Sequence, residues 1–143
     1  MQPINPHSLF SIFEKGDEEV YKEHGLEDTL NNPFVLMGMV LRGIENYFMM
    51  DIMYSKTYPE EYKKVRKITQ LKYFNNLFGY LKRIDIRKPD KVYTIGESFN
   101  IEQTVDGLDV MRKFYEKIEH YEKCAVIKKY IDLLIKQSSP TLI

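Results

Sequence analysis

The most apolar stretch of the sequence is PFVLMGMVLRGIENYFMMDIMY, residues 33–54. Asn31 and Asn32 are N-cap candidates, and Pro33 suits the first helical position because its missing N–H costs nothing there. Apolar residues recur at intervals of three and four on one side: Leu36, Val40, Ile44 and Tyr47. Others widen this apolar sector: Met37, Leu41, Phe48 and Ile52. We therefore expect a central helix that is buried on several sides.

A membrane span is the rival interpretation of this stretch, and it would need about 20 consecutive apolar residues. Polar residues interrupt the stretch at four positions: Arg42, Glu45, Asn46 and Asp51. A charge near the middle of a bilayer costs about 3 kcal/mol on insertion scales. We therefore expect a core helix of a soluble domain and no membrane contact.

Asp51 would lie on the apolar side of this helix, near Tyr47 and Tyr54. One interpretation is a buried carboxylate with a perturbed pKa at a functional site. The other is that Asp51 accepts a hydrogen bond from a tyrosine, pairs with a lysine or arginine, or turns outward where the helix ends. The sequence favours the second.

Length and composition indicate one globular domain, residues 1–143, with enough chain to bury a core. Cys124 is the single cysteine, so no intrachain disulfide can form, which suits a reducing compartment. The first residues, MQPINPHSLF, lack the charged and apolar regions of a secretory signal. We expect a cytoplasmic protein. The Lys/Asn/Tyr-rich composition would also fit a phage or other virus, with the protein in the host cytoplasm or the virion.

The fold expected is mainly α, a small bundle of four to six helices around residues 33–54. The other expected helices span residues 8–14, 17–24, 59–84 and two segments between 106 and 136. The helix at 59–84 either bends near residues 69–70 or passes from one neighbour to another, and Thr104 or Asp106 is the expected cap of the next. Pro89 and Asp90 predict a turn in a short extended or hairpin insertion near residues 85–100. Residues 1–7 and 138–143 are expected to be irregular.

Known catalytic motifs, phosphate loops and EF-hand loops are absent from the sequence. The chain has three histidines, and one cysteine cannot build a cysteine-rich zinc site. Glu116, His120 and Cys124 would share one face of an unbroken helix, as a metal stripe or a Cys–His pair. The alternative is that the helix breaks near His120. We predict no catalytic residue, metal or cofactor; a small enzyme built around Asp51 or His120 is the least favoured alternative.

Charge is unevenly distributed, although the chain has 21 basic and 21 acidic residues. Residues 63–91 have ten basic and two acidic residues, whereas residues 1–62 have four and eleven. The candidates for nucleic-acid contact are Lys63, Lys64, Arg66, Lys67, Lys72, Lys82, Arg83, Arg87, Lys88 and Lys91. Tyr73 and Tyr80 lie between them and Tyr93 follows Lys91, and these tyrosines could stack on bases. A solvated helix face, or pairing with the acidic part, would explain the same pattern.

The segment YEKCAVIKKYIDLL, Tyr121–Leu134, preceded by VMRKFYEKIEH, resembles the UVR motif, a helical hairpin of excision-repair proteins and protease adaptors. The resemblance covers residues 106–136. Seven positions match: Tyr121, Glu122, Lys123, Ala125, Ile127, Ile131 and Leu134. Cys124 replaces the usual Ala, and Lys128-Lys129 replace Arg-Asp, which puts the pairing mode of the family in doubt. The resemblance implies protein docking through Tyr121, Cys124, Lys128 and Lys129; core packing of the hairpin is the alternative.

These features together favour a non-enzymatic adaptor or structural subunit that binds a larger protein assembly or another copy of itself. The main support is the absence of catalytic groups, the abundance of Tyr and Met, and the segments of opposite charge. The second hypothesis is a nucleic-acid-binding accessory protein that uses residues 63–91.

Overall fold

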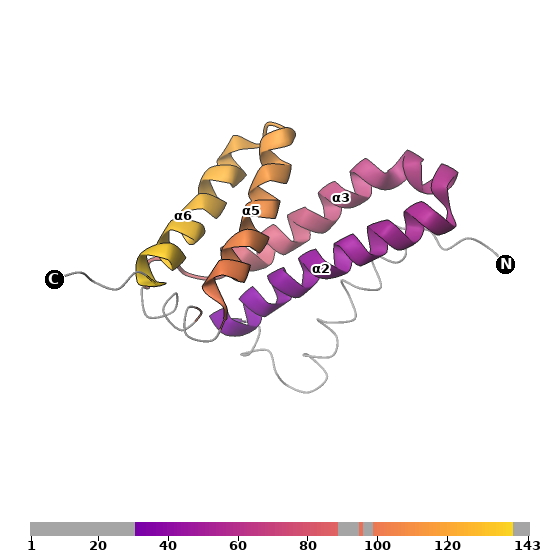
Figure 1. Ribbon diagram of the computed structural model, residues 1–143. Helices are drawn as coiled ribbons and strands as arrows, with labels where there is room; N and C mark the ends of the chain where they lie inside the picture. The colour runs from indigo at the N-terminus through magenta and orange to yellow at the C-terminus, as the bar shows by residue number, and fades with distance from the viewer. Residues whose placement is uncertain (1–30, 89–94, 96–98, 139–143) are drawn as a thin grey trace.

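The computed structural model describes residues 31–88, 95 and 99–138, and within them it contains four helices and no strand (Figure 1). The helices are α2 (Pro33–Thr57), α3 (Pro59–Lys82), α5 (Ile101–Lys117) and α6 (Tyr121–Ser138). The predicted mainly α fold is therefore confirmed. The elements expected in residues 1–30 and 139–143 lie outside the described residues.

The central helix α2 begins where the sequence predicts. The side-chain oxygen of Asn32 accepts a hydrogen bond of 2.8 Å from the backbone N–H of Phe34, and Pro33 occupies the first helical position. The helix ends at Thr57 because Pro59 disfavours helical geometry at Tyr58, whose φ is −134°. One residue thus joins α2 to α3, which folds back beside it.

Close packing joins α2 to α3. A Cβ atom added at Gly43 would clash with Leu77 of α3, so the missing side chain lets the two helices approach. The predicted apolar side of α2 is buried at all four positions: Leu36, Val40, Ile44 and Tyr47. The Tyr47 ring packs against Phe74 at 5.1 Å between ring centroids. The side of the central helix marked by these four residues is therefore buried.

A second hairpin consists of α5 and α6. Asn100 caps α5 by accepting a 3.0 Å hydrogen bond from the N–H of Gln103, so the predicted cap at Thr104 or Asp106 is wrong. Thr104 is instead a buried residue inside the helix, where its hydroxyl donates to the carbonyl of Asn100. The chain turns at Glu119, which has a left-handed φ of 64°, before α6 begins.

The second hairpin packs against one half of the first. Gly107 of α5 lies beneath Leu41 and Ile44 of α2. Aromatic pairs join α3 to α5, with ring centroids 4.7 Å apart for Phe74 and Phe114. The Tyr130 hydroxyl of α6 donates a 2.7 Å hydrogen bond to the carbonyl of Ile84. On either side of the α5–α6 turn, the Tyr115 hydroxyl and the Lys123 ammonium both donate to the side-chain oxygen of Asn75 in α3, at 2.9 and 2.8 Å. Figure 1 shows the α5–α6 hairpin beside one end of the α2–α3 hairpin.

The alternatives for α3 are now resolved. The helix is unbroken from Pro59 to Lys82, and its neighbours change along its length. Tyr62 stacks on Tyr54 of α2, whereas Phe78 packs edge to face on Tyr115 of α5. The rotating apolar face in the sequence therefore reflects a second partner, α5, that joins α2 along the later turns of α3.

The described part of residues 85–100 contains no strand. Residues 85–88 form a turn, and Ile95 is helical and buried. The predicted turn at Pro89 and Asp90 lies outside the described residues, with 91–94 and 96–98.

Candidate functional site

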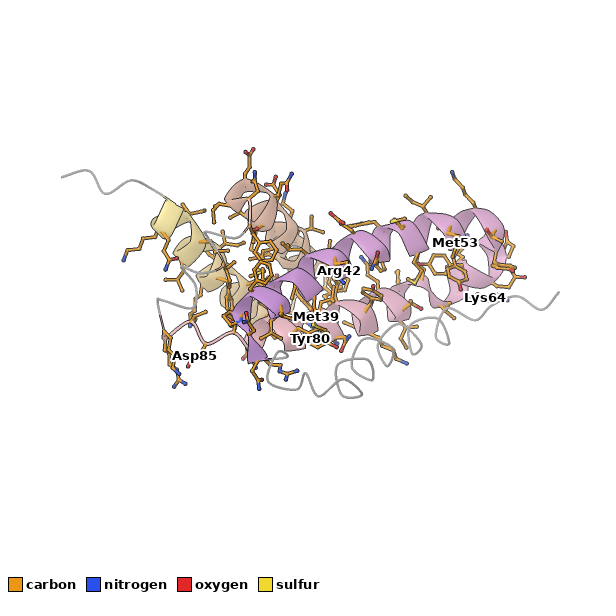
Figure 2. All side chains as sticks on the ribbon, turned by 90° about the horizontal axis from the view of Figure 1, so that it is seen from below. Met39, Arg42, Met53, Lys64, Tyr80 and Asp85 are labelled. Carbon is orange, nitrogen blue, oxygen red and sulfur yellow. The ribbon has the colours of Figure 1, made fainter. Side chains whose placement is uncertain are left out.

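Four large apolar side chains are exposed on the last turns of α2. Their exposed fractions are 42% for Phe48, 69% for Met49, 56% for Ile52 and 50% for Met53. We call these four residues the α2 end patch. They form two pairs four residues apart, so they share one side of the helix. Met53 and Lys64 both lie toward the turn end of the α2–α3 hairpin (Figure 2).

The prediction that Phe48 and Ile52 belong to a covered sector is therefore wrong. The reason is that the α5–α6 hairpin packs on the other half of the α2–α3 hairpin, where Gly107 lies beneath Leu41 and Ile44. Met49 and Met53 were missed because the apolar positions that define the predicted buried sector are centred on the Leu36 side of the helix. The sequence feature that could have identified them is the width of the apolar sector, which is too great for one neighbouring helix to cover.

A buried carboxylate holds the opposite side of this end together. Asp51 is 8% exposed and receives three hydrogen bonds. Arg66 of α3 donates two of them, from Nε at 2.9 Å and from a terminal nitrogen at 2.8 Å. The Tyr62 hydroxyl donates the third at 2.7 Å. The second interpretation of Asp51 thus describes the structure, because its oxygens are paired with both a tyrosine and an arginine.

The protonation of this cluster follows from its contacts. Burial raises the pKa of Asp51, but the hydrogen bonds from Arg66 and Tyr62 outweigh it, so the pKa lies below its usual value. Burial and the nearby Asp51 charge raise the pKa of Tyr47 to about 12. Burial and the hydrogen bond to Asp51 likewise raise the pKa of Tyr62. At neutral pH the cluster is therefore an ionised aspartate with neutral tyrosines, which is a structural arrangement.

An open groove of about 780 Å³ lies between α3 and α5 and reaches the α2 end patch at Phe48. The lining residues are Phe48, Lys67, Ile68, Gln70, Leu71, Phe74, Val110, Lys113, Phe114, Lys117, Ile118 and His120. Most of these side chains are apolar. Ile68 and Ile118 are themselves exposed, so the groove is accessible from solvent. We call this feature the α3–α5 groove.

The charge of the α3–α5 groove has one sign. Lys67 lies on the α3 wall, Lys113 and Lys117 lie on the α5 wall, and no aspartate or glutamate among the described residues lines the groove. Lys113 pairs with Asp109 at 3.2 Å. Among the described residues, neither Lys67 nor Lys117 forms an ion pair. The groove therefore combines a mostly apolar lining with lysines from both helices.

The predicted nucleic-acid residues form two separate groups. Lys63, Lys64, Arg66, Lys67 and Lys72 are exposed along α3. The second group, also exposed, contains Lys82, Arg83, Arg87 and Lys88, whereas Lys91 lies outside the described residues. The helical rise puts Lys63 and Arg83 about 30 Å apart. Lys64 and Asp85, which mark the two groups, accordingly lie at opposite ends of the molecule (Figure 2).

All three of these arginines already have partners. Arg66 binds Asp51, and Arg87 pairs with Asp85 at 3.0 Å. Arg83 donates a 3.2 Å hydrogen bond to the side-chain oxygen of Asn31. The tyrosines expected to stack on bases are core residues, because Tyr73 is 3% and Tyr80 6% exposed. Tyr93 lies outside the described residues. The structure thus leaves the lysines accessible but gives them no aromatic platform from Tyr73 or Tyr80.

The predicted docking residues of α6 differ in accessibility. Tyr121, Lys128 and Lys129 are exposed. Cys124 is half-buried against α5, where its Sγ donates a 3.4 Å hydrogen bond to the carbonyl of Arg112. Burial raises the pKa of this thiol. The side of α6 away from these exposed residues belongs to the core through Ile127, Tyr130, Ile131 and Leu134. Ala125, one of the positions that match the UVR motif, is exposed.

Glu116, His120 and Cys124 do not form one helical stripe. The helix breaks between Lys117 and Tyr121, as the alternative interpretation held, and the His120 ring stacks on Tyr115 with 6.1 Å between centroids. Within the described ranges, no three His, Cys, Asp or Glu residues are arranged to hold a metal ion. His120 lines the α3–α5 groove whereas Asp51 does not, so this groove does not bring the two residues together.

None of the helices α2, α3, α5 and α6 has the length and apolar content that crossing a membrane requires. A comparison with protein-family models found no match to this chain, and comparisons with curated proteins and with solved structures found none either. The UVR resemblance of residues 106–136 therefore stays a prediction.

Proposed function

We propose that this chain is a non-enzymatic adaptor or structural subunit that attaches to a larger protein assembly through the α2 end patch. The observation that supports the proposal most is the exposure of four large apolar side chains within six residues of one helix. Contiguous exposed apolar surface is typical of interaction sites. Methionine in particular is enriched at interfaces, because its flexible side chain adapts to different partners.

The underlying structure suits such a role. The Asp51, Tyr62 and Arg66 hydrogen bonds hold α2 against α3 directly behind the α2 end patch. The patch is thus presented on a rigid hairpin end, which lowers the entropic cost of binding.

The test is affinity capture from the organism that makes the protein, with captured proteins quantified by mass spectrometry. The double variant Met49→Asp/Met53→Asp should lose the partner that the unmodified chain captures, by at least about tenfold, because it puts two charges in the apolar contact. Both side chains are at least half exposed, so the variant should remain folded.

Tyr121→Asp/Ile135→Asp is the matched control, because it places the same two charges on exposed apolar positions of α6. Capture should persist with this control. Loss of the partner in the control, together with retention in the α2 variant, would move the docking surface to α6 and contradict the proposal.

Nucleic-acid binding is a second candidate, favoured by four exposed cations within five residues of α3: Lys63, Lys64, Arg66 and Lys67. Such clusters bind phosphates, and the binding weakens as salt rises. Fluorescence anisotropy with single- and double-stranded DNA and RNA at two salt concentrations tests it. Salt-sensitive binding that is lost in Lys63→Glu/Lys64→Glu would support this candidate, and its absence would remove it.

A further inference from the structure

We propose that the α3–α5 groove binds an acidic amphipathic helix of a partner protein. Apolar residues of that helix would occupy the groove, and carboxylates on its two flanks would meet Lys67 and Lys117. The inference rests on the proposed function, since it names the kind of partner segment that a protein-binding subunit would recognise.

The shape and lining of the groove suit a helix. Residues of α3 and α5 line most of it, and its apolar lining includes Leu71, Phe74 and Phe114. Its volume of about 780 Å³ lies within the usual range of binding clefts. An amphipathic helix binds such a groove through apolar residues at intervals of three and four. Several such side chains would be needed to fill this space.

The charge of the groove selects an acidic occupant. Lys67 and Lys117 lie on opposite walls, and neither forms an ion pair within the part of the chain that the structure describes. Carboxylates flanking the apolar side of a bound helix would be complementary to both walls. A second copy packed groove to groove would place lysines against lysines, which disfavours self-association through this surface.

The apolar surface also extends beyond the groove. Phe48 belongs both to the groove and to the α2 end patch, and Ile52 follows it one helical turn later. One turn adds about 5 Å along α2. A partner helix can use this extended surface, whereas a small amphiphile such as a fatty acid would fill the groove alone. The continuity therefore favours a protein segment.

The test uses the full-length chain and three fluorescein-labelled synthetic peptides of equal length. The first is an amphipathic helix with leucines on one side and glutamates on both flanks. The second has lysines in place of the glutamates, and the third has the composition of the first in an order that abolishes amphipathicity. Anisotropy titrations should show saturable binding of the first peptide, and binding at least about tenfold weaker for the other two.

Variants then locate the binding. Lys67→Glu/Lys117→Glu should weaken binding of the glutamate peptide by at least about tenfold and improve binding of the lysine peptide. Lys63→Glu/Lys64→Glu is the control with the same change of charge on exposed residues outside the groove lining, and it should change affinity by less than about threefold. Ile68→Asp should abolish binding. Circular dichroism and thermal unfolding verify that each variant is folded.

Three results would overturn the inference. The first is equal affinity for the three peptides, or no saturable binding of the glutamate peptide. The second is equal sensitivity to the groove and control reversals. The third is displacement of the bound peptide by palmitate, or by the unlabelled protein with a dimer seen in light scattering, which would assign the groove to an amphiphile or to a second copy.

The failure of this inference can be separated from that of the proposed function. Met49→Asp/Met53→Asp tests capture by the α2 end patch, and neither residue lines the groove. Loss of capture in that variant with no peptide binding would reject the groove helix alone. Peptide binding with capture that is insensitive to the patch would reject the patch alone.

Discussion

The two ends of the α2–α3 hairpin differ in whether their apolar side chains are covered by a neighbouring helix. At the end covered by α5 and α6, apolar side chains of α2 such as Ile44 are buried beneath a neighbouring helix. At the turn end, Ile52 lies on the same helix but remains exposed, and the Asp51–Arg66–Tyr62 hydrogen bonds join the two helices. Apolar content alone therefore does not decide whether a side chain is buried. A residue is buried where a neighbour covers it, and an uncovered apolar end is available for a partner.

The largest expected difference in stability between the two ends comes from truncating an isoleucine to alanine at each end. Ile44→Ala should lower the free energy of unfolding by about 2–4 kcal/mol, because it leaves a cavity at a buried site. Ile52→Ala should change it by less than about 0.5 kcal/mol, because that side chain is already in water. Urea denaturation of both variants measures the difference. Similar losses would mean that the turn end is covered as well.

Removal of the buried carboxylate should have the next largest effect. Asp51→Ala leaves the Tyr62 hydroxyl without its acceptor and frees Arg66, at a cost of about 2 kcal/mol. Asp109→Ala is the control on α5, where Asp109 pairs with Arg112 in a more exposed setting, and it should cost less than about 1 kcal/mol. An Asp51→Ala protein as stable as the unmodified chain would show that these hydrogen bonds do not hold the turn end.

The ionised Asp51 paired with Arg66 should make the free energy of unfolding depend on pH. Since the folded-state pKa of Asp51 lies below the unfolded value, its contribution is present above about pH 4 and is lost as the pH falls through the folded pKa. The stability gap between the unmodified chain and Asp51→Asn should therefore narrow below about pH 4. Denaturation of both proteins at several pH values measures the gap. A gap that widens on acidification would contradict the assignment of the ionised form.

Replacing a glycine by alanine should have opposite effects on stability in α2 and in α3. Gly43→Ala would push a Cβ atom into Leu77 and should destabilise the protein by about 1–2 kcal/mol. Gly79→Ala meets no atom within 4 Å and should stabilise it by about 0.5–1 kcal/mol, because alanine favours helix more than glycine does. Thermal unfolding distinguishes them. Stabilisation by both changes would contradict the close approach of α2 and α3.

The stacked tyrosines of the turn end offer the finest comparison. Tyr54 and Tyr62 are both 1% exposed, but the Tyr62 hydroxyl is bonded to Asp51 and the Tyr54 hydroxyl has no partner among the described residues. Tyr62→Phe should cost about 1 kcal/mol, whereas Tyr54→Phe should be neutral or stabilise slightly. Urea denaturation tests the order of the two variants, and the reverse order would contradict the hydrogen bonding of this cluster.

Local chemistry made much of the fold predictable. The start of α2 at Asn32–Pro33 follows from capping, and the start of α3 at Pro59 follows from the geometry of proline. The break near His120 was one of two alternatives that the sequence left open. The exposure of Phe48 and Ile52 could not be predicted, because it depends on where a hairpin far along the chain comes to rest. The α3–α5 groove was likewise missed, since its lysines belong to two helices that are 46 residues apart at Lys67 and Lys113. Sequence patterns report one helix at a time, whereas a groove needs two.

The most direct test of the exposed α2 end is the solvent accessibility of its methionines. In a protein with isotopically labelled methionine methyl groups, a soluble nitroxide should strongly broaden the NMR signals of Met49 and Met53. The signals of Met37 and Met111, which are fully buried, should be little affected and provide the internal reference. Met49 and Met53 signals as protected as those of Met37 and Met111, in dilute monomeric protein, would contradict the account.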